Sequence, residues 1–126
     1  MAKKEVKTDL WVYELLQEAD IDLTPQGGDI KVIDEALKTA SKSKTGNAGY
    51  PEYCGVVKDF ILVIEDKASL DKHICNDENG LLSQEVKAVK DYAVNGALFY
   101  ALHLVANTSY NKVLAFGVSG NEKHHK

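Results

Sequence analysis

Two acidic side chains and one basic side chain stand at the end of the most apolar stretch of this sequence. Residues 60–64 are all apolar and mostly β-branched or aromatic, which predicts a strand buried on both faces. The stretch ends in Glu65, Asp66 and Lys67. Side chains alternate along a strand, so Glu65 and Lys67 are predicted to share one face and Asp66 to point to the other. A carboxylate and an amine therefore emerge together where the core ends.

An upstream acid is predicted to face Glu65 across a β-hairpin. Lys58-Asp59 has apolar residues on both sides and suits a two-residue turn. Folding the chain back there gives a register that ends with Glu52 opposite Glu65, and a bulge at Gly55 would shift it. Directly opposed residues have Cβ atoms roughly 4.5–5.5 Å apart, where like charges repel. A shared proton would relieve the repulsion, but a hard cation such as Mg²⁺ does so more naturally, since it binds carboxylates together with substrate phosphates.

These residues and their surroundings resemble the PD-(D/E)xK nucleases. Glu52 matches the first acid, and Glu65-Asp66-Lys67 matches the (D/E)xK triplet. Further stretches resemble the amino-terminal nuclease domain of restriction-modification enzymes, both type I restriction subunits and type IIG enzymes that fuse a nuclease to a methyltransferase. They are residues 36–42, 49–53, 63–69, 92–98 and 115–120, and the similarity runs from about residue 10 to residue 120.

Two positions depart from the family pattern. The first acid is Glu52, where the family more often has Asp, and this keeps the carboxylate chemistry on a longer side chain. Many type I relatives carry Gln four residues before a helix tyrosine. The matching tyrosine is Tyr92 and the matching position is Ala88, which favours a type IIG-like assignment.

The resemblance implies an α/β fold with a restriction-endonuclease-like core, in which a small mixed β-sheet is flanked by α-helices. It implies a Mg²⁺-dependent DNA endonuclease, with Mn²⁺ as a substitute metal. Glu52 and Glu65 would bind the metal, and the backbone carbonyl of Asp66 would be a further ligand. Lys67 would complete the catalytic set by orienting the attacking water or stabilising the charge that develops on the phosphate.

Four more side chains are candidates beside this set. Glu35 or Glu14, each on a predicted helix, is a candidate for an additional metal ligand, although an exposed surface glutamate explains each one equally well or better. Lys42 and Lys44 lie in a glycine-containing loop just before the site. Lysines in such a loop can contact DNA phosphates, and a solubilising loop is the plainer interpretation.

The expected partners are double-stranded DNA and the methyltransferase, specificity or helicase domains or subunits of the same system. A net charge of −4 argues against a simple electrostatic nucleic-acid binder and suggests that DNA affinity comes from other domains. We therefore expect residues 1–126 to be a single domain and an amino-terminal fragment of a larger restriction-modification protein. Two alternatives stay open: a catalytically silent docking module with the nuclease fold, and a repair or junction-type nuclease with the same site.

Composition is that of an ordinary globular domain. The 126 residues are 44% hydrophobic and 27% charged, and no apolar run approaches the roughly 18–20 residues of a membrane span. The first residues lack the features of a secretory signal. Cys54 and Cys75 are scattered and are expected to be free thiols. These features predict a cytoplasmic protein.

The apolar periodicity predicts the elements that position the site. We expect one helix from Thr8 or Asp9 to about residue 19, with Leu10, Tyr13 and Leu16 on one face and Val12 as a further candidate for it. A second helix is expected over residues 30–42, and a long third helix from residue 81 or 83 to about 106. This third helix is a crossover that leads to a strand over 113–118, which would run parallel to its neighbour.

Overall fold

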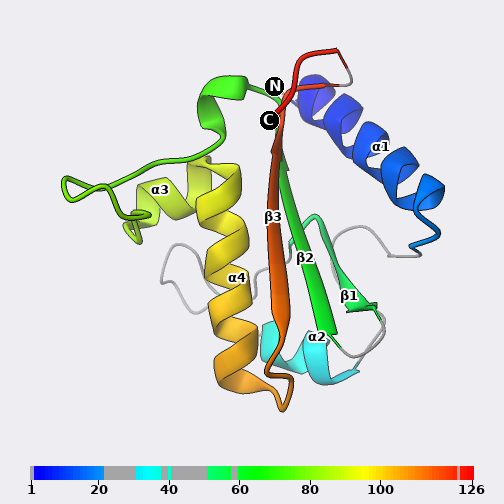
Figure 1. Cartoon of the computed structure of the whole chain (residues 1–126), viewed down its shortest axis with the longest axis vertical. Helices are drawn as coiled ribbons and strands as arrows, with labels where there is room; N and C mark the ends of the chain where they lie inside the picture. Colours follow the sequence, from blue (N-terminus) through cyan, green and yellow to red (C-terminus); the bar gives the residue numbers. More distant parts are fainter. Residues whose placement is uncertain (1, 22–30, 38–39, 41–50, 58–59, 122) are drawn as a thin grey trace.

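The computed structural model describes residues 2–21, 31–37, 40, 51–57, 60–121 and 123–126. Figure 1 shows the helices and strands of this part of the chain. In chain order they are α1 (Ala2–Glu18), α2 (Lys31–Leu37), β1 (Tyr53–Val57), β2 (Phe60–Lys67), the short 3-10 helix η1 (Leu70–Lys72), α3 (Val86–Asp91), α4 (Ala93–Asn107) and β3 (Val113–Ser119). Within the described residues, no helix has the length and apolar character that crossing a membrane requires.

The described strands form one mixed sheet in the order β1-β2-β3. Strand β1 runs antiparallel to β2, and β3 runs parallel to β2. The hairpin register runs without a bulge through Gly55, from Val57 opposite Phe60 to Tyr53 opposite Ile64. The strand pairing ends there, so Glu52, the residue before β1, is not part of it, and the turn itself lies outside the described residues. A small mixed α/β fold is therefore confirmed.

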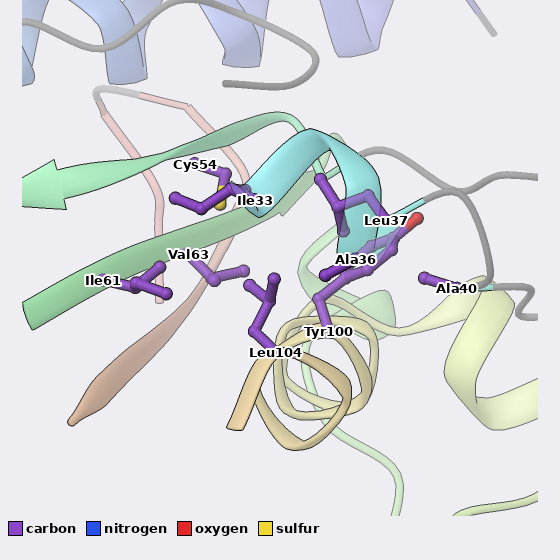
Figure 2. Close-up of a cluster of buried hydrophobic side chains, with 9 residues drawn as sticks. All are labelled: Ile33, Ala36, Leu37, Ala40, Cys54, Ile61, Val63, Tyr100 and Leu104. Carbon is purple, nitrogen blue, oxygen red and sulfur yellow. The ribbon is translucent and has the colours of Figure 1, made fainter. Parts of the chain in front are cut away.

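Helices cover both faces of this sheet. Helix α1 lies on one side, and α2 and α4 lie on the other (Figure 1). The core under α1 contains Val12, Leu16, Tyr53, Leu62 and Ile64. The core under α2 and α4 is larger, and Figure 2 shows its side chains pointing toward one another from both helices and from the strands. It consists of Ile33, Ala36, Leu37, Ala40, Cys54, Ile61, Val63, Tyr100 and Leu104. The alternation of β2 thus separates two cores, as expected for a strand buried on both faces.

Helix α1 buries only part of the stripe that was expected. Among its side chains whose burial is described, Thr8, Val12 and Leu16 are buried, and their spacing keeps them on one face. Leu10 and Tyr13 are exposed, so their predicted place on the buried face is wrong. The helix also begins at Ala2 rather than at residue 8 or 9. Thr8 is therefore inside the helix, and its hydroxyl donates a hydrogen bond to the carbonyl of Gly120 at 2.8 Å.

Helix α2 is shorter than predicted. It covers Lys31–Leu37, whereas the apolar spacing predicted residues 30–42. Ala40 is buried but not helical, and its N–H donates to the carbonyl of Leu37. The remaining predicted residues, 30, 38–39 and 41–42, lie outside the described part of the chain.

The long helix predicted over residues 81–106 is two helices. Its first residues form a β-bridge instead, in which Leu82 pairs with Asn76. Tyr92 then has an extended backbone between α3 and α4. The first turn of α4 leaves N–H groups without helical partners, and the N–H of Val94 donates to the carbonyl of His73. The apolar periodicity of the sequence continues through this break. It could not reveal the break, because the pattern carries no information about hydrogen bonds to distant backbone groups.

Asn95 fastens the segment between β2 and α3 to helix α4. It is buried, and its side-chain oxygen accepts the N–H of Cys75 at 2.9 Å. Its amide nitrogen donates to the carbonyls of Cys75 and Ser83 at 2.8 and 2.9 Å. One amide side chain thereby satisfies three backbone groups of an irregular segment, which a buried polar residue must do to be stable.

Gly117 allows helix α4 to lie close to strand β3. A Cβ atom at this position would be 2.5 Å from the backbone nitrogen of Val94 and 2.7 Å from its Cα atom. Because Gly117 pairs with Glu65 across the sheet, this close approach holds α4 next to the strand end that carries the acids.

We predict that Gly117→Ala destabilises the domain. The added methyl group meets backbone atoms that cannot rotate away, so the free energy of unfolding should fall by about 1–3 kcal/mol. Urea unfolding followed by circular dichroism measures this. Ala115→Ser, at an exposed position of the same strand, is the control and should change stability by less than about 0.5 kcal/mol. Equal stability of both variants would contradict the close packing of α4 on β3.

Candidate functional site

Glu52 and Glu65 meet at the open end of the β1–β2 hairpin. The backbone N–H of Glu52 donates a hydrogen bond to the Oε1 atom of Glu65 at 2.9 Å. Glu65 is only 4% exposed, and Glu52 is half-buried. The contact follows from the hairpin register, since the residue after the last strand pair is brought to the same level of the sheet. The two acids that the sequence singled out are thus neighbours, in contact through the backbone of one and the side chain of the other.

Lys67 lies one step beyond Glu65 on the same face of β2, as the alternation predicted. It is half-buried and pairs with Ser119 of β3. Its carbonyl accepts the N–H of Gly120 at 2.9 Å, so its backbone position is fixed by both neighbouring segments. Tyr100 of α4 belongs to the core on this side. Burial raises the pKa of Tyr100, and the charges of Glu65 and Glu52 raise it further.

His73 is also on this side of the site. Its Nδ1 atom lies 3.0 Å from the hydroxyl oxygen of Ser119, the residue that pairs with Lys67. Burial lowers the pKa of His73, and the positive charge of Lys126 lowers it further. The hydrogen bond to Ser119 places His73 beside the strand position of Lys67.

The opposite face of β2 carries a carboxylate cluster that sequence reasoning did not find. Asp9, Glu52 and Asp66 each offer a carboxylate oxygen, and these oxygens all lie within 4.8 Å of one another. Asp66 is 3% exposed. Within the described residues, no N–H or O–H group donates a hydrogen bond to either of its oxygens, and the same is true of Oδ1 of Asp9. Asp66 itself was expected to contribute only its backbone carbonyl to a metal.

Two hydrogen bonds bring Asp9 to the sheet. Tyr53 of β1 donates its hydroxyl to the carbonyl of Asp9 at 2.7 Å. One residue earlier in α1, Thr8 is bonded to Gly120, which follows β3. These contacts fix α1 at the level where β2 ends. In the sequence Asp9 was placed only at the start of a predicted helix, and its local sequence carries no signal for a place in the cluster.

The other candidate ligands lie apart from this cluster. Glu14 is exposed and lines a cleft between α1 and the end of the chain, together with Trp11 and His125. Glu35 is exposed on α2. Neither belongs to the cluster of three acids found among the described residues, and a role for either stays a prediction. Lys42 and Lys44 lie outside the described residues.

The environment of Asp66 opposes its ionised form. Burial raises the pKa of Asp66, and so does Asp9, which can share a proton with it and adds a negative charge. The charges of Glu52 and Glu65 raise it further. Burial also raises the pKa of Tyr53, and the charges of Asp9, Asp66 and Glu52 raise it further. Several negative charges thus lie close together in a site with little access to water.

A cation fits this donor set. Ionised carboxylates that lack donors can be balanced by a proton or by a metal ion, because an uncompensated buried charge is costly. Oxygens separated by up to 4.8 Å can share one ion, since Mg²⁺ and Ca²⁺ bind oxygen at roughly 2.0–2.6 Å. The residues present could therefore hold a hard divalent metal.

Comparison with known proteins links the chain to restriction-modification. It is 33% identical over 128 residues to RM.BcgI, a type II restriction enzyme and methyltransferase of Heyndrickxia coagulans. The alignment covers the whole of this chain and 20% of that relative, so the chain spans about one fifth of its length. No protein-family model matches the chain, and no solved structure matches it significantly.

We predict that Asp66→Asn stabilises the metal-free domain as the pH rises. The folded state holds a proton on Asp66 that the unfolded state releases above its ordinary pKa of 3.8. Stability therefore falls from that pH upward toward the raised pKa. Asn is uncharged and of similar shape, so it removes this loss. Each unit by which the pKa is raised corresponds to about 1.4 kcal/mol, and we expect a gain above about 1 kcal/mol at pH 8.

Urea unfolding in EDTA at pH 4, 6 and 8 tests this expectation. The difference between Asp66→Asn and the parent should grow with pH. Glu78→Gln, at an exposed loop position, is the control and should give a difference that stays small. A constant difference for Asp66→Asn at all three values would mean that Asp66 ionises normally in the folded protein.

Proposed function

We propose that this chain is the divalent-metal-dependent endonuclease domain of a restriction-modification protein, and that it hydrolyses phosphodiester bonds of double-stranded DNA. The observation that supports the proposal most directly is the contact between the backbone N–H of Glu52 and the Oε1 atom of Glu65 at 2.9 Å, with Lys67 two residues further along β2. The contact makes Glu52 and Glu65 neighbours, as the resemblance to PD-(D/E)xK nucleases would require of its two acids. The similar protein is a restriction enzyme and methyltransferase, which supports the same context.

The proposed roles follow from position and charge. The carboxylates of Glu52 and Glu65 would hold Mg²⁺, or Mn²⁺ in its place, with the backbone carbonyl of Asp66 as a further ligand. When bound, the cation supplies an acidified water and neutralises charge on the scissile phosphate. Lys67 would direct its ammonium group at the attacking water or at the phosphate oxygens, where a fixed positive charge stabilises the developing negative charge. Its half-buried position limits the water that would otherwise screen that charge.

DNA affinity and sequence choice are proposed to come from regions other than this domain. A net charge of −4 gives little general attraction for DNA, because non-specific binding depends on neutralising phosphates with lysine and arginine. We therefore propose that sequence choice and most DNA affinity come from a methyltransferase or specificity region acting with this domain. The domain itself contributes the cutting chemistry.

Lys67→Ala should lower DNA cleavage in Mg²⁺ by roughly 10²–10³-fold, the loss expected when one preorganised stabilising group is removed. Folding should change little, because Lys67 stands at the end of β2 and its strand pairing uses the backbone. Nicking and linearisation of supercoiled plasmid, followed over time, measures the rate. Near-ultraviolet circular dichroism checks the fold.

Lys72→Ala is the matched control. Lys72 is exposed and its ammonium lies over the ring of Tyr92, 5.0 Å from the ring centre, in the segment just after β2. Cleavage by this variant should stay within about threefold of the parent, since it removes a lysine without touching the acids. Cleavage by Lys67→Ala at the parent rate would contradict the catalytic assignment.

A further inference from the structure

We propose that Asp9, Glu52 and Asp66 form a second cation site on the α1 face of the sheet, which takes a hard divalent cation and fastens helix α1 to strand β2. This site and the proposed Glu52–Glu65 centre lie on opposite faces of the sheet, and Glu52 contributes to both. It does not depend on the proposed nuclease activity.

The side chain of Asp66 is the observation that points to a ligand. It is 3% exposed, and no described donor reaches either of its oxygens. It lies within 4.8 Å of carboxylate oxygens from two other elements. Buried carboxylates are normally paired with donors or coordinate metals. The groups that face it here are further acids, so a cation satisfies all of them at once where a hydrogen-bond donor would satisfy one.

The donor chemistry selects the class of ion. All three side chains offer carboxylate oxygen, which suits Mg²⁺, Ca²⁺ and Mn²⁺. Within the described residues, the cluster includes no sulfur or imidazole ligand, and zinc and copper sites commonly use these. The hydroxyl of Tyr53 is bonded to the backbone carbonyl of Asp9, which fixes the helix residue that carries one of the three ligands.

The three ligands belong to segments that are far apart in the sequence. Asp9 is on α1, Glu52 immediately precedes β1 and Asp66 is near the end of β2. One ion shared among them would cross-link the helix to the hairpin. Bound cation would therefore stabilise the folded state by mass action, and α1 would respond to its removal before the sheet does.

Terbium luminescence tests the site without any measurement of cleavage. Tb³⁺ replaces Ca²⁺ at oxygen sites, and Tyr53 lies close enough to transfer excitation to it. We expect tyrosine-sensitised emission from the chelator-treated parent, displaced by Ca²⁺ or Mn²⁺. Asp66→Asn and Asp9→Asn should each weaken Tb³⁺ binding by at least about tenfold, because each removes a charged ligand. Glu78→Gln, at an exposed loop position, is the control and should keep the emission.

A thermal measurement guards against misfolded variants. In EDTA, Asp66→Asn should melt no lower than the parent, since it loses a buried acid without a donor. Added Ca²⁺ should raise the melting temperature of the parent and of Glu78→Gln, and should raise that of Asp66→Asn by less. Absence of sensitised emission in the parent, or parent-like affinity in folded Asp66→Asn, would overturn the second site.

The outcome also separates this proposal from the nuclease. Emission lost only in Glu65→Gln would place the cation between Glu52 and Glu65, which overturns the second site and leaves the proposed function standing. Emission lost in Asp66→Asn, with cleavage by the parent indistinguishable from that of Lys67→Ala, would support the second site and reject the nuclease.

Discussion

The end of strand β2 is buried on both faces, and the acids there constrain the structure around it. Glu65 and Asp66 are consecutive residues, each less than 5% exposed, and alternation turns them to opposite sides of the sheet. An ionised carboxylate in such a position costs several kcal/mol or more unless donors or cations compensate it. Each face of the sheet must therefore supply its own compensation, by donors or by a cation, for the acid that it buries.

The two acids have different neighbours on the two faces. Glu65 accepts the N–H of Glu52, a bond that the hairpin register provides. Asp66 has acids as neighbours, and within the described residues no donor reaches its two oxygens. The hydrogen bonds of Thr8 and Tyr53 hold α1 in that arrangement and do not use the side chains of Asp9 or Asp66. Three carboxylates therefore lie close enough together to hold one cation.

Sequence patterns were sufficient for the parts of the fold that local rules decide. The buried strand, the hairpin register and the parallel third strand follow from apolar runs, turn chemistry and the crossover connection, and these expectations are confirmed. The break at Tyr92 was not predictable, because it depends on the carbonyl of His73 meeting the N–H of Val94, a contact between distant segments. The stripe of α1 was misjudged for a related reason. Thr8 can be buried there because its hydroxyl donates to the carbonyl of Gly120, which is distant in the sequence.

The same distinction explains what could be inferred about the site. Glu52, Glu65 and Lys67 come from one hairpin, so the backbone contact between Glu52 and Glu65 is a matter of register and can be worked out from the residues. Asp9 comes from a helix whose docking is set by tertiary contacts, and nothing in its local sequence distinguishes it from a helix cap.

Glu52 is where the two sides of the site meet. It immediately precedes β1, so the alternation of the strand no longer dictates the direction of its side chain. Its backbone N–H contacts Glu65, while its carboxylate lies with Asp9 and Asp66. A residue held by its backbone on one face and offering its charge to the other links the two sets of acids electrostatically. Any ion that neutralises one set lowers the repulsion felt by the other, so occupancy of the two faces should be coupled through this one residue.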